Sequence, residues 1–110
     1  MDQPNMADLF GKMMEMQQKM AETQEALGNQ TATAEAGGGM VTVTADGRGR
    51  VKSLKLEKEV VNPDDLELLE DLLVAGINKA LSEAEALRES EMKKTAGSFL
   101  PPGMDLGGLM

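Results

Sequence analysis

The chain has 110 residues, room for one domain, and a formal net charge of −8, which by itself argues against a polyanionic partner. It contains no Cys, His, Trp or Tyr, which excludes disulfides, thiolate metal sites, a cysteine nucleophile and a histidine general base. The remaining carboxylates, Lys, Arg, Ser and Thr form no recognisable catalytic arrangement, so we expect no enzyme, no metal site, no cofactor and no small-molecule substrate.

The first ten residues, MDQPNMADLF, are acidic and lack the basic start and apolar run of a signal peptide. No window approaches the ~18 consecutive apolar residues that a membrane span requires. We therefore expect a cytoplasmic protein without membrane contact. Residues 1–5 are expected to be flexible, as chain termini commonly are.

An amphipathic helix is predicted over residues 6–27, because its apolar residues follow three- and four-residue steps close to a heptad. Gly28 and its neighbour Asn29 should end the helix, since both tolerate the left-handed cap conformation. Met at helical spacing favours adaptable packing over ligation of a soft metal. Met13, Met16 and Met20 are therefore predicted to pack against another helix.

Three short strands should follow. QTATAEA at 30–36 alternates Thr and Ala, and glycines 37–39 form a permissive connector. VTVT at 41–44 alternates as a half-buried strand does, and the alternation resumes at Leu54. Between these two strands, Asp46-Gly47 is a dipeptide that readily takes positive φ, so it predicts a hairpin turn.

The hairpin carries a basic segment, residues 48–58, within an acidic chain. Its basic residues are Arg48, Arg50, Lys52, Lys55 and Lys58, and its one acid is Glu57. Local charge can attract phosphate in an acidic protein, because the Debye length is only ~8 Å at physiological salt. Protection of a strand edge against aggregation is an alternative role for such residues. Lys52 shares strand parity with Leu54, so either the basic residues lie near strand ends or a bulge redirects them.

A second, longer helix is predicted over residues 64–94, with Asn62 as its N-cap and Pro63 at its first position. At 1.5 Å per residue it would be about 46 Å long, which exceeds the sheet that it covers. Its second half should therefore project or meet another chain. Residues 97–110, rich in Gly and Pro, are expected to be flexible.

This order of elements predicts an α+β fold with one small three-stranded antiparallel sheet between two long helices. Such a sheet has a marginal core, which favours a symmetric dimer over a monomer whose two helices pack on each other. The residues predicted for the dimer interface are Met13, Met16, Met20, Val41 and Val43.

Several strings, in this order and spacing, resemble the YbaB/EbfC family of bacterial nucleoid-associated proteins over nearly the whole chain. They are FGKMMEMQQKMAETQE, GGGMVTVTADGRGRVKSLKLE, PDDLELLEDLLVAGINKAL and EMKKTAGSFLPPGM. The resemblance implies a tweezer-like homodimer that binds double-stranded DNA, associates with the nucleoid, influences DNA conformation and gene expression, and has no catalytic activity. The acidic, Gly-rich ending MDLGGLM departs from more basic relatives and should contribute less to DNA contact.

On this basis we predict weak, salt-sensitive and largely sequence-tolerant DNA binding. The predicted DNA contacts are Arg48, Arg50, Lys52, Lys55, Lys93 and Lys94. One alternative is a protein-interaction dimer that uses its projecting helices and the Met-rich seam formed by Met13, Met16 and Met20, with DNA binding secondary or absent. Another is a carboxylate enzyme with Mg²⁺ held by Asp64, Asp65 and Glu67, although acids in a first helical turn ordinarily complement the helix dipole.

Overall fold

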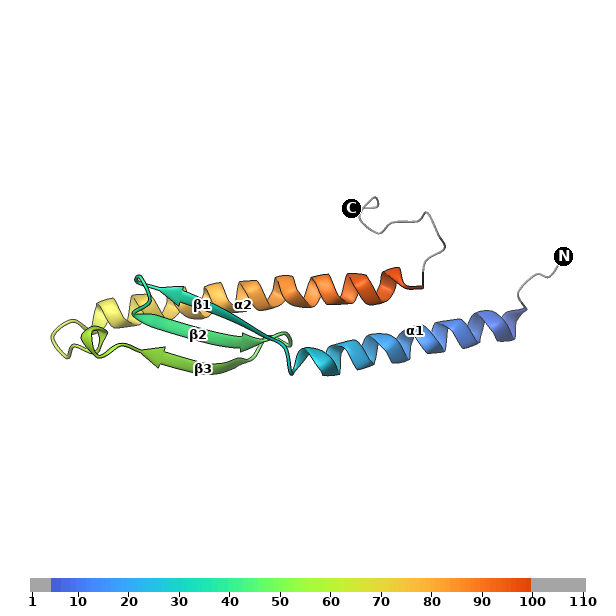
Figure 1. Cartoon of the computed structure of the whole chain (residues 1–110), viewed down its shortest axis with the longest axis horizontal. Helices are drawn as coiled ribbons and strands as arrows, with labels where there is room; N and C mark the ends of the chain where they lie inside the picture. Colours follow the sequence, from blue (N-terminus) through green and yellow to red (C-terminus); the bar gives the residue numbers. More distant parts are fainter. Residues whose placement is uncertain (1–4, 100–110) are drawn as a thin grey trace.

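The structure, a computed structural model that describes residues 5–99, has the predicted α+β fold. Its elements are α1 (Met6–Leu27), β1 (Thr31–Ala36), β2 (Val41–Asp46), β3 (Val51–Leu56), a single 3₁₀ turn η1 (Lys58–Val60) and α2 (Leu66–Gly97). The molecule is a rod of 77 × 25 × 15 Å. The first half of α2 covers the sheet and its second half runs beside α1 (Figure 1).

The N-terminal helix α1 begins and ends where the sequence predicts. The side chain of Asn5 caps it by accepting a hydrogen bond from the Asp8 N–H at 2.8 Å. The predicted left-handed cap is wrong, because Gly28 has a φ of −63°. Instead the helix tightens into 3₁₀-type bonds, with the Gly28 N–H donating to the Glu25 carbonyl at 3.1 Å. Apart from Asn5 and residues 97–99, the segments that we expected to be flexible lie outside the described residues.

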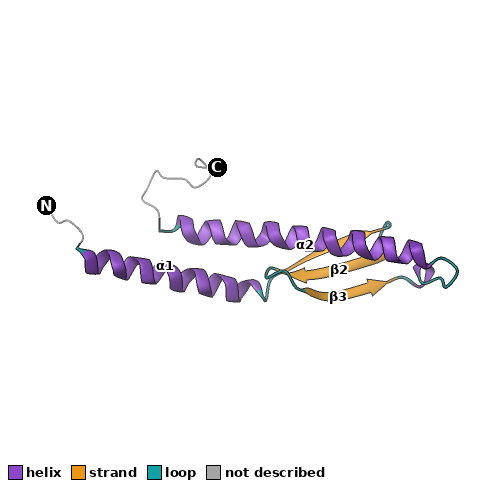
Figure 2. Cartoon of the chain, turned by 180° about the vertical axis from the view of Figure 1, so that it is seen from behind, coloured by secondary structure: helices purple, strands orange, loops and turns teal. Residues whose placement is uncertain are grey.

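The three strands form one antiparallel sheet in the order β1-β2-β3 (Figure 2). Glycines 37–39 connect β1 to β2 with positive φ angles of 64°, 68° and 96°. The predicted tight turn at Asp46-Gly47 is wrong: residues 47–50 form a longer loop, in which Gly49 takes the positive φ, 88°. The Asp46 N–H donates to the Arg50 carbonyl at 2.8 Å and closes this loop.

A β-bulge in β3 decides which side chains of that strand face the core. Leu54 pairs with Val43, but Val51 pairs with Ala45, and the shift leaves Lys52 without a partner in the register. Val51 therefore takes the core-facing position that strict alternation would give to Lys52. Lys55, which pairs with Thr42, points to the opposite face of the sheet.

Small residues allow α2 to lie close to the sheet. A β-carbon at Gly76 would approach Val43 Cγ2 to 3.2 Å and Val41 Cγ1 to 3.3 Å. Ala80 and Ala84 continue the contact and are fully buried. Val41 and Val43 are 0% exposed beneath α2, so they have no surface for a partner chain, and their assignment to a dimer interface is wrong.

We expect Gly76→Val to lower the free energy of unfolding by about 1–3 kcal/mol, because its branched side chain would overpack the helix–sheet contact. Gly11→Ala is the matched control, since nothing lies within 4 Å of a β-carbon at Gly11. The control should gain about 0.5–1 kcal/mol from helix propensity. Urea unfolding followed by circular dichroism measures both values. Equal stability of Gly76→Val and the parent chain would contradict the close contact.

The second helix starts later than predicted. Asp65, not Asn62, is its N-cap, and its carboxylate accepts from the Leu68 N–H at 3.3 Å. Asn62 instead accepts from the Asp64 N–H at 3.0 Å in the preceding turn. Pro63 is therefore a turn residue, two positions before the N-cap.

The second half of α2 does meet another helix, but in the same chain. The hydroxyl groups of Thr23 on α1 and Thr95 on α2 lie 2.7 Å apart and share a hydrogen bond. The N-terminal part of α1 extends beyond the end of α2 (Figure 1). Its Met6, Phe10 and Met13 side chains are largely exposed there.

Candidate nucleic-acid interface

A buried carboxylate helps to fix the backbone of the β2–β3 loop, residues 47–50. Asp46, 3% exposed, accepts hydrogen bonds from the backbone N–H groups of Arg48 at 2.9 Å and Arg50 at 3.1 Å. These bonds use the backbone of the two arginines and leave their guanidinium groups free to face solvent. The loop therefore presents two exposed cations on an ordered backbone.

Two opposing effects act on the pKa of Asp46. Burial disfavours the charged carboxylate and raises the pKa, while the N–H groups of Arg50 and Arg48 and the charges of Lys52 and Arg50 lower it. The lowering effects prevail, so the pKa lies below its ordinary value of 3.8. Asp46 therefore stabilises the fold fully above pH 3.8, and this contribution is lost as the pH falls through the lower folded-state pKa.

Asp46→Asn should destabilise the chain at neutral pH, because a neutral amide binds the two N–H groups less strongly than a carboxylate. The stability gap between parent and variant should close as the pH falls below 3.8, where the parent carboxylate also becomes neutral. Urea unfolding at pH 7 and at pH 3 measures the gap. A gap of the same size at both pH values would contradict the role of the charge.

The same loop is attached to the end of α1. The Gly47 N–H donates to the Leu27 carbonyl at 3.0 Å and to the Gln30 carbonyl at 2.9 Å. A β-carbon at Gly47 would lie 2.7 Å from Leu27 Cδ2, so the close approach requires glycine. The loop thus lies where the sheet meets the helical half of the molecule (Figure 1).

The structure brings together some of the predicted DNA contacts and separates others. Arg48 and Arg50 share the loop, and Lys52 lies at the adjoining bulge. Lys55 lies further along β3, on the face of the sheet away from α2. Lys93 and Lys94 lie near the end of α2, where Lys94 pairs with Glu91 at 3.4 Å.

The sequence-based prediction missed a cation beside the loop, Arg88 of α2. Arg88 and Arg48 line one recess of about 180 Å³ together with Gln24 and Leu27. In the sequence Arg88 stands among acidic residues of the helix, so its charge attracts no attention there. No local pattern predicts it, because its proximity to Arg48 arises from the packing of α2 against the sheet and α1.

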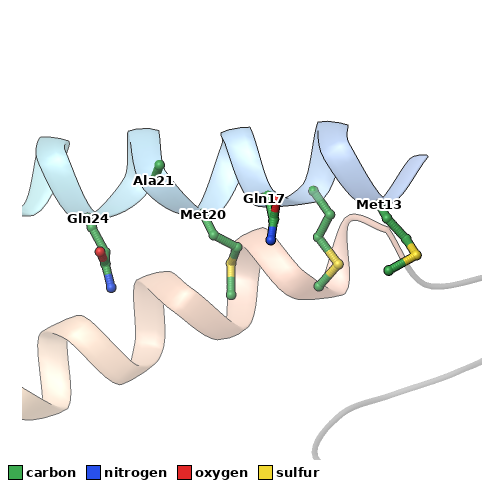
Figure 3. Close-up of a pocket in the computed structure, with 6 residues that line it drawn as sticks. Met13, Gln17, Met20, Ala21 and Gln24 are labelled. Carbon is green, nitrogen blue, oxygen red and sulfur yellow. The ribbon is translucent and has the colours of Figure 1, made fainter. Parts of the chain in front are cut away.

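The Met-rich seam lines a groove of about 410 Å³ on α1. Met13, Met20 and Gln24 project from α1 on the side where the second half of α2 lies (Figure 3). Part of the seam therefore adjoins a helix of the same chain. Met16 and Met20 are half-buried, whereas Met13 remains 68% exposed.

The edge strand β3 leaves apolar side chains uncovered. Val51, Leu54 and Leu56, here called the β3 face, are 42%, 39% and 40% exposed. They pair across the sheet with buried residues of β2, so they lie on the core side of the sheet beyond the cover of α2. This face is available to a second molecule.

Within residues 5–99, no three His, Cys, Asp or Glu side chains are grouped so that they could hold a metal ion. Asp65, one of the candidate Mg²⁺ ligands, instead caps α2. Neither described helix is apolar enough over a sufficient length to cross a bilayer.

Residues 2–99 match the sequence profile of the YbaB/EbfC DNA-binding family. The chain belongs to this family. It is 47% identical over 106 residues to a nucleoid-associated protein of Thermodesulfovibrio yellowstonii, with 92% of this chain and 93% of the relative covered. It is 45% identical over 94 residues to a nucleoid-associated protein of Syntrophobacter fumaroxidans, with 86% of each chain covered.

The fold is also similar to the crystal structure of an uncharacterized protein from Helicobacter pylori, with a TM-score of 0.69. That alignment covers 78% of this chain and 90% of the other at 23% sequence identity, so it supports the fold alone. Membership of the YbaB/EbfC DNA-binding family confirms the resemblance found in the sequence strings.

Proposed function

We propose that this chain is a nucleoid-associated protein that binds double-stranded DNA as a homodimer, mainly through the phosphate backbone, and alters DNA conformation and gene expression. The observation that carries the proposal is the basic loop, in which buried Asp46 and the end of α1 fix the backbone that carries Arg48 and Arg50. Membership of a DNA-binding family supports DNA as the ligand of this loop. The protein acts in the cytoplasm, at the nucleoid, without catalysis or a cofactor.

Binding through phosphates fits the charge distribution. The exposed cations of the loop and of β3 lie outside the acidic surface of α2, and screening limits repulsion beyond ~8 Å at physiological salt. Guanidinium groups suit phosphate because their N–H groups can donate two parallel hydrogen bonds. Neither long helix presents the basic face that insertion into the major groove would require, so binding should be largely independent of base sequence.

Two features support the homodimer. The β3 face exposes three large apolar side chains beside an unpaired strand edge, which a monomer leaves in contact with water. Met13, Met16 and Met20 add a second apolar surface on α1, of which Met13 is the most exposed. A twofold dimer through these surfaces would present the basic loop twice, and two linked sites bind one duplex more tightly than either alone.

The test is a titration of a labelled duplex by fluorescence anisotropy at several salt concentrations, with the protein mass measured in the same buffer. We expect a dimeric mass and an affinity that falls steeply as salt rises, with a slope that gives the number of phosphates engaged. A chain that fails to bind duplex DNA even at low salt would refute the proposal. A monomeric mass with salt-dependent binding would refute its dimeric part.

One observation favours a second function, a dimer that captures another protein. The projecting end of α1 exposes Met6, Phe10 and Met13, and such flexible or aromatic side chains suit an apolar helix of a partner. This function predicts partner binding that survives high salt and fails when Met13 or Met16 becomes charged. Salt dependence therefore separates it from the DNA-binding function.

A further inference from the structure

Arg48 and Arg88 are 40 positions apart in the sequence but line one recess. Gln24 and Leu27 of α1 complete its lining, so three elements meet there: the β2–β3 loop, α1 and α2. Arg88 also lines a second recess of about 290 Å³, together with Gly47 and Gly49 of the loop. The side chain of Arg88 therefore lies alongside the loop that carries Arg48.

Contacts within the chain leave these two cations available to a ligand. Arg88 pairs with Glu85 at 4.0 Å, the longest of the three ion pairs among residues 5–99, and its side chain remains 47% exposed. The stem of Arg48 crosses the end of α1, where a β-carbon at Gly28 would approach Arg48 Cδ to 3.3 Å. The last turn of α1 has no basic residue of its own, so Arg48 brings positive charge to its negative end.

We propose that Arg48 and Arg88 together hold one phosphate group of the DNA backbone, with the side-chain amide of Gln24 as an additional donor. This site rests on the proposed function and assigns to it two residues, Arg88 and Gln24, that the sequence did not indicate. Two guanidinium forks and an amide N–H₂ provide the donors that phosphate oxygens accept. Glu85 competes with the phosphate for Arg88 and so limits the affinity of the site.

The site has a mechanical consequence. A phosphate bound there bridges the loop at the end of the sheet and the long helix α2. The DNA contact then extends from the loop onto the helical half of the molecule instead of being confined to the strand edge. The backbone N–H of Gly47, which donates to the Leu27 and Gln30 carbonyls, holds the loop against the end of α1 on one side of this bridge.

Arg88→Gln tests the site, with Lys79→Gln as the matched control. Lys79 is an exposed cation nine residues earlier on α2, two and a half turns away and therefore on the opposite face of the helix. For Arg88→Gln we expect an affinity for a labelled duplex about tenfold lower. The slope of log K against log salt should fall by about 0.9 for each copy of the site engaged. Lys79→Gln should match the parent chain in both quantities.

A third variant, Glu85→Gln, distinguishes phosphate binding from a purely structural role of Arg88. Removing the competing carboxylate should increase DNA affinity, whereas loss of a structural ion pair would leave it unchanged or lower it. Equal affinity and slope for Arg88→Gln and Lys79→Gln would overturn the site while leaving the proposed function intact. A changed oligomeric mass of Arg88→Gln would also count against the site, because the loss of affinity would then reflect assembly and not a lost phosphate contact. A parent chain without salt-dependent binding would overturn both.

Discussion

Reversal of both loop charges, Arg48→Glu with Arg50→Glu, is expected to reduce the affinity for duplex DNA by at least about a hundredfold. Each chain changes by four charge units at the proposed contact, so attraction to phosphate becomes repulsion. The slope of log K against log salt should fall by about 1.8 per chain, because two phosphate contacts are lost. Anisotropy titrations at three salt concentrations measure both quantities.

The fold should survive this double substitution. Asp46 binds the backbone N–H groups of residues 48 and 50, which glutamate also possesses, and both arginine side chains are exposed. The matched control is Lys12→Glu with Lys79→Glu, which adds the same charge on exposed helix positions away from the loop. If the control loses as much affinity as the loop variant, binding depends on net charge, and the loop is not the contact.

Much of the fold could be predicted from the sequence because it depends on local patterns. The apolar spacing of α1 and the alternation of VTVT each reflect one face of one element, and the structure confirms both elements. The N-cap of α2 was misplaced because Asn62 and Asp65 are both good caps. In the structure Asn62 accepts from the Asp64 N–H in the preceding turn, and Asp65 accepts from the Leu68 N–H and caps the helix.

The site was less predictable because it depends on register and on packing between distant segments. Asp46-Gly47 has the composition of a tight turn, yet the buried Asp46 carboxylate stabilises a longer loop by binding two N–H groups further on. The bulge that leaves Lys52 unpaired is a property of the strand pair and has no signature in one strand. Arg88 becomes a candidate only when α2 lies across the loop.

The same dependence explains the error at the dimer interface. Val41 and Val43 are apolar, and a sheet can be covered either by another sheet or by a helix of its own chain. The first half of α2 covers them completely, because Gly76 and Ala80 allow it to lie close. It covers β3 less completely. The uncovered apolar surface therefore lies on the β3 face, one strand away from the predicted position on β2.

Leu54→Glu should therefore convert the proposed dimer into monomers. Leu54 is 39% exposed in the single chain, so a glutamate there can reach water and the monomer can fold. In a dimer through the β3 face, the same carboxylate would be buried without a partner, which costs several kcal/mol. That cost raises the dissociation constant of the dimer by roughly a thousandfold. Light scattering coupled to size-exclusion chromatography over a concentration series measures the change.

Ser53→Glu is the matched control, because Ser53 lies on the same strand but pairs with Thr44 on the opposite face of the sheet. It adds the same charge one residue away and should remain dimeric. Retention of the dimer by Leu54→Glu would exclude the β3 face and leave Met13, Met16 and Met20 as the interface. If Leu54→Glu is instead monomeric by light scattering and folded by circular dichroism, its weaker DNA binding measures what the second basic loop adds. A monomer has one loop per duplex contact, so its salt slope should be about half that of the parent chain.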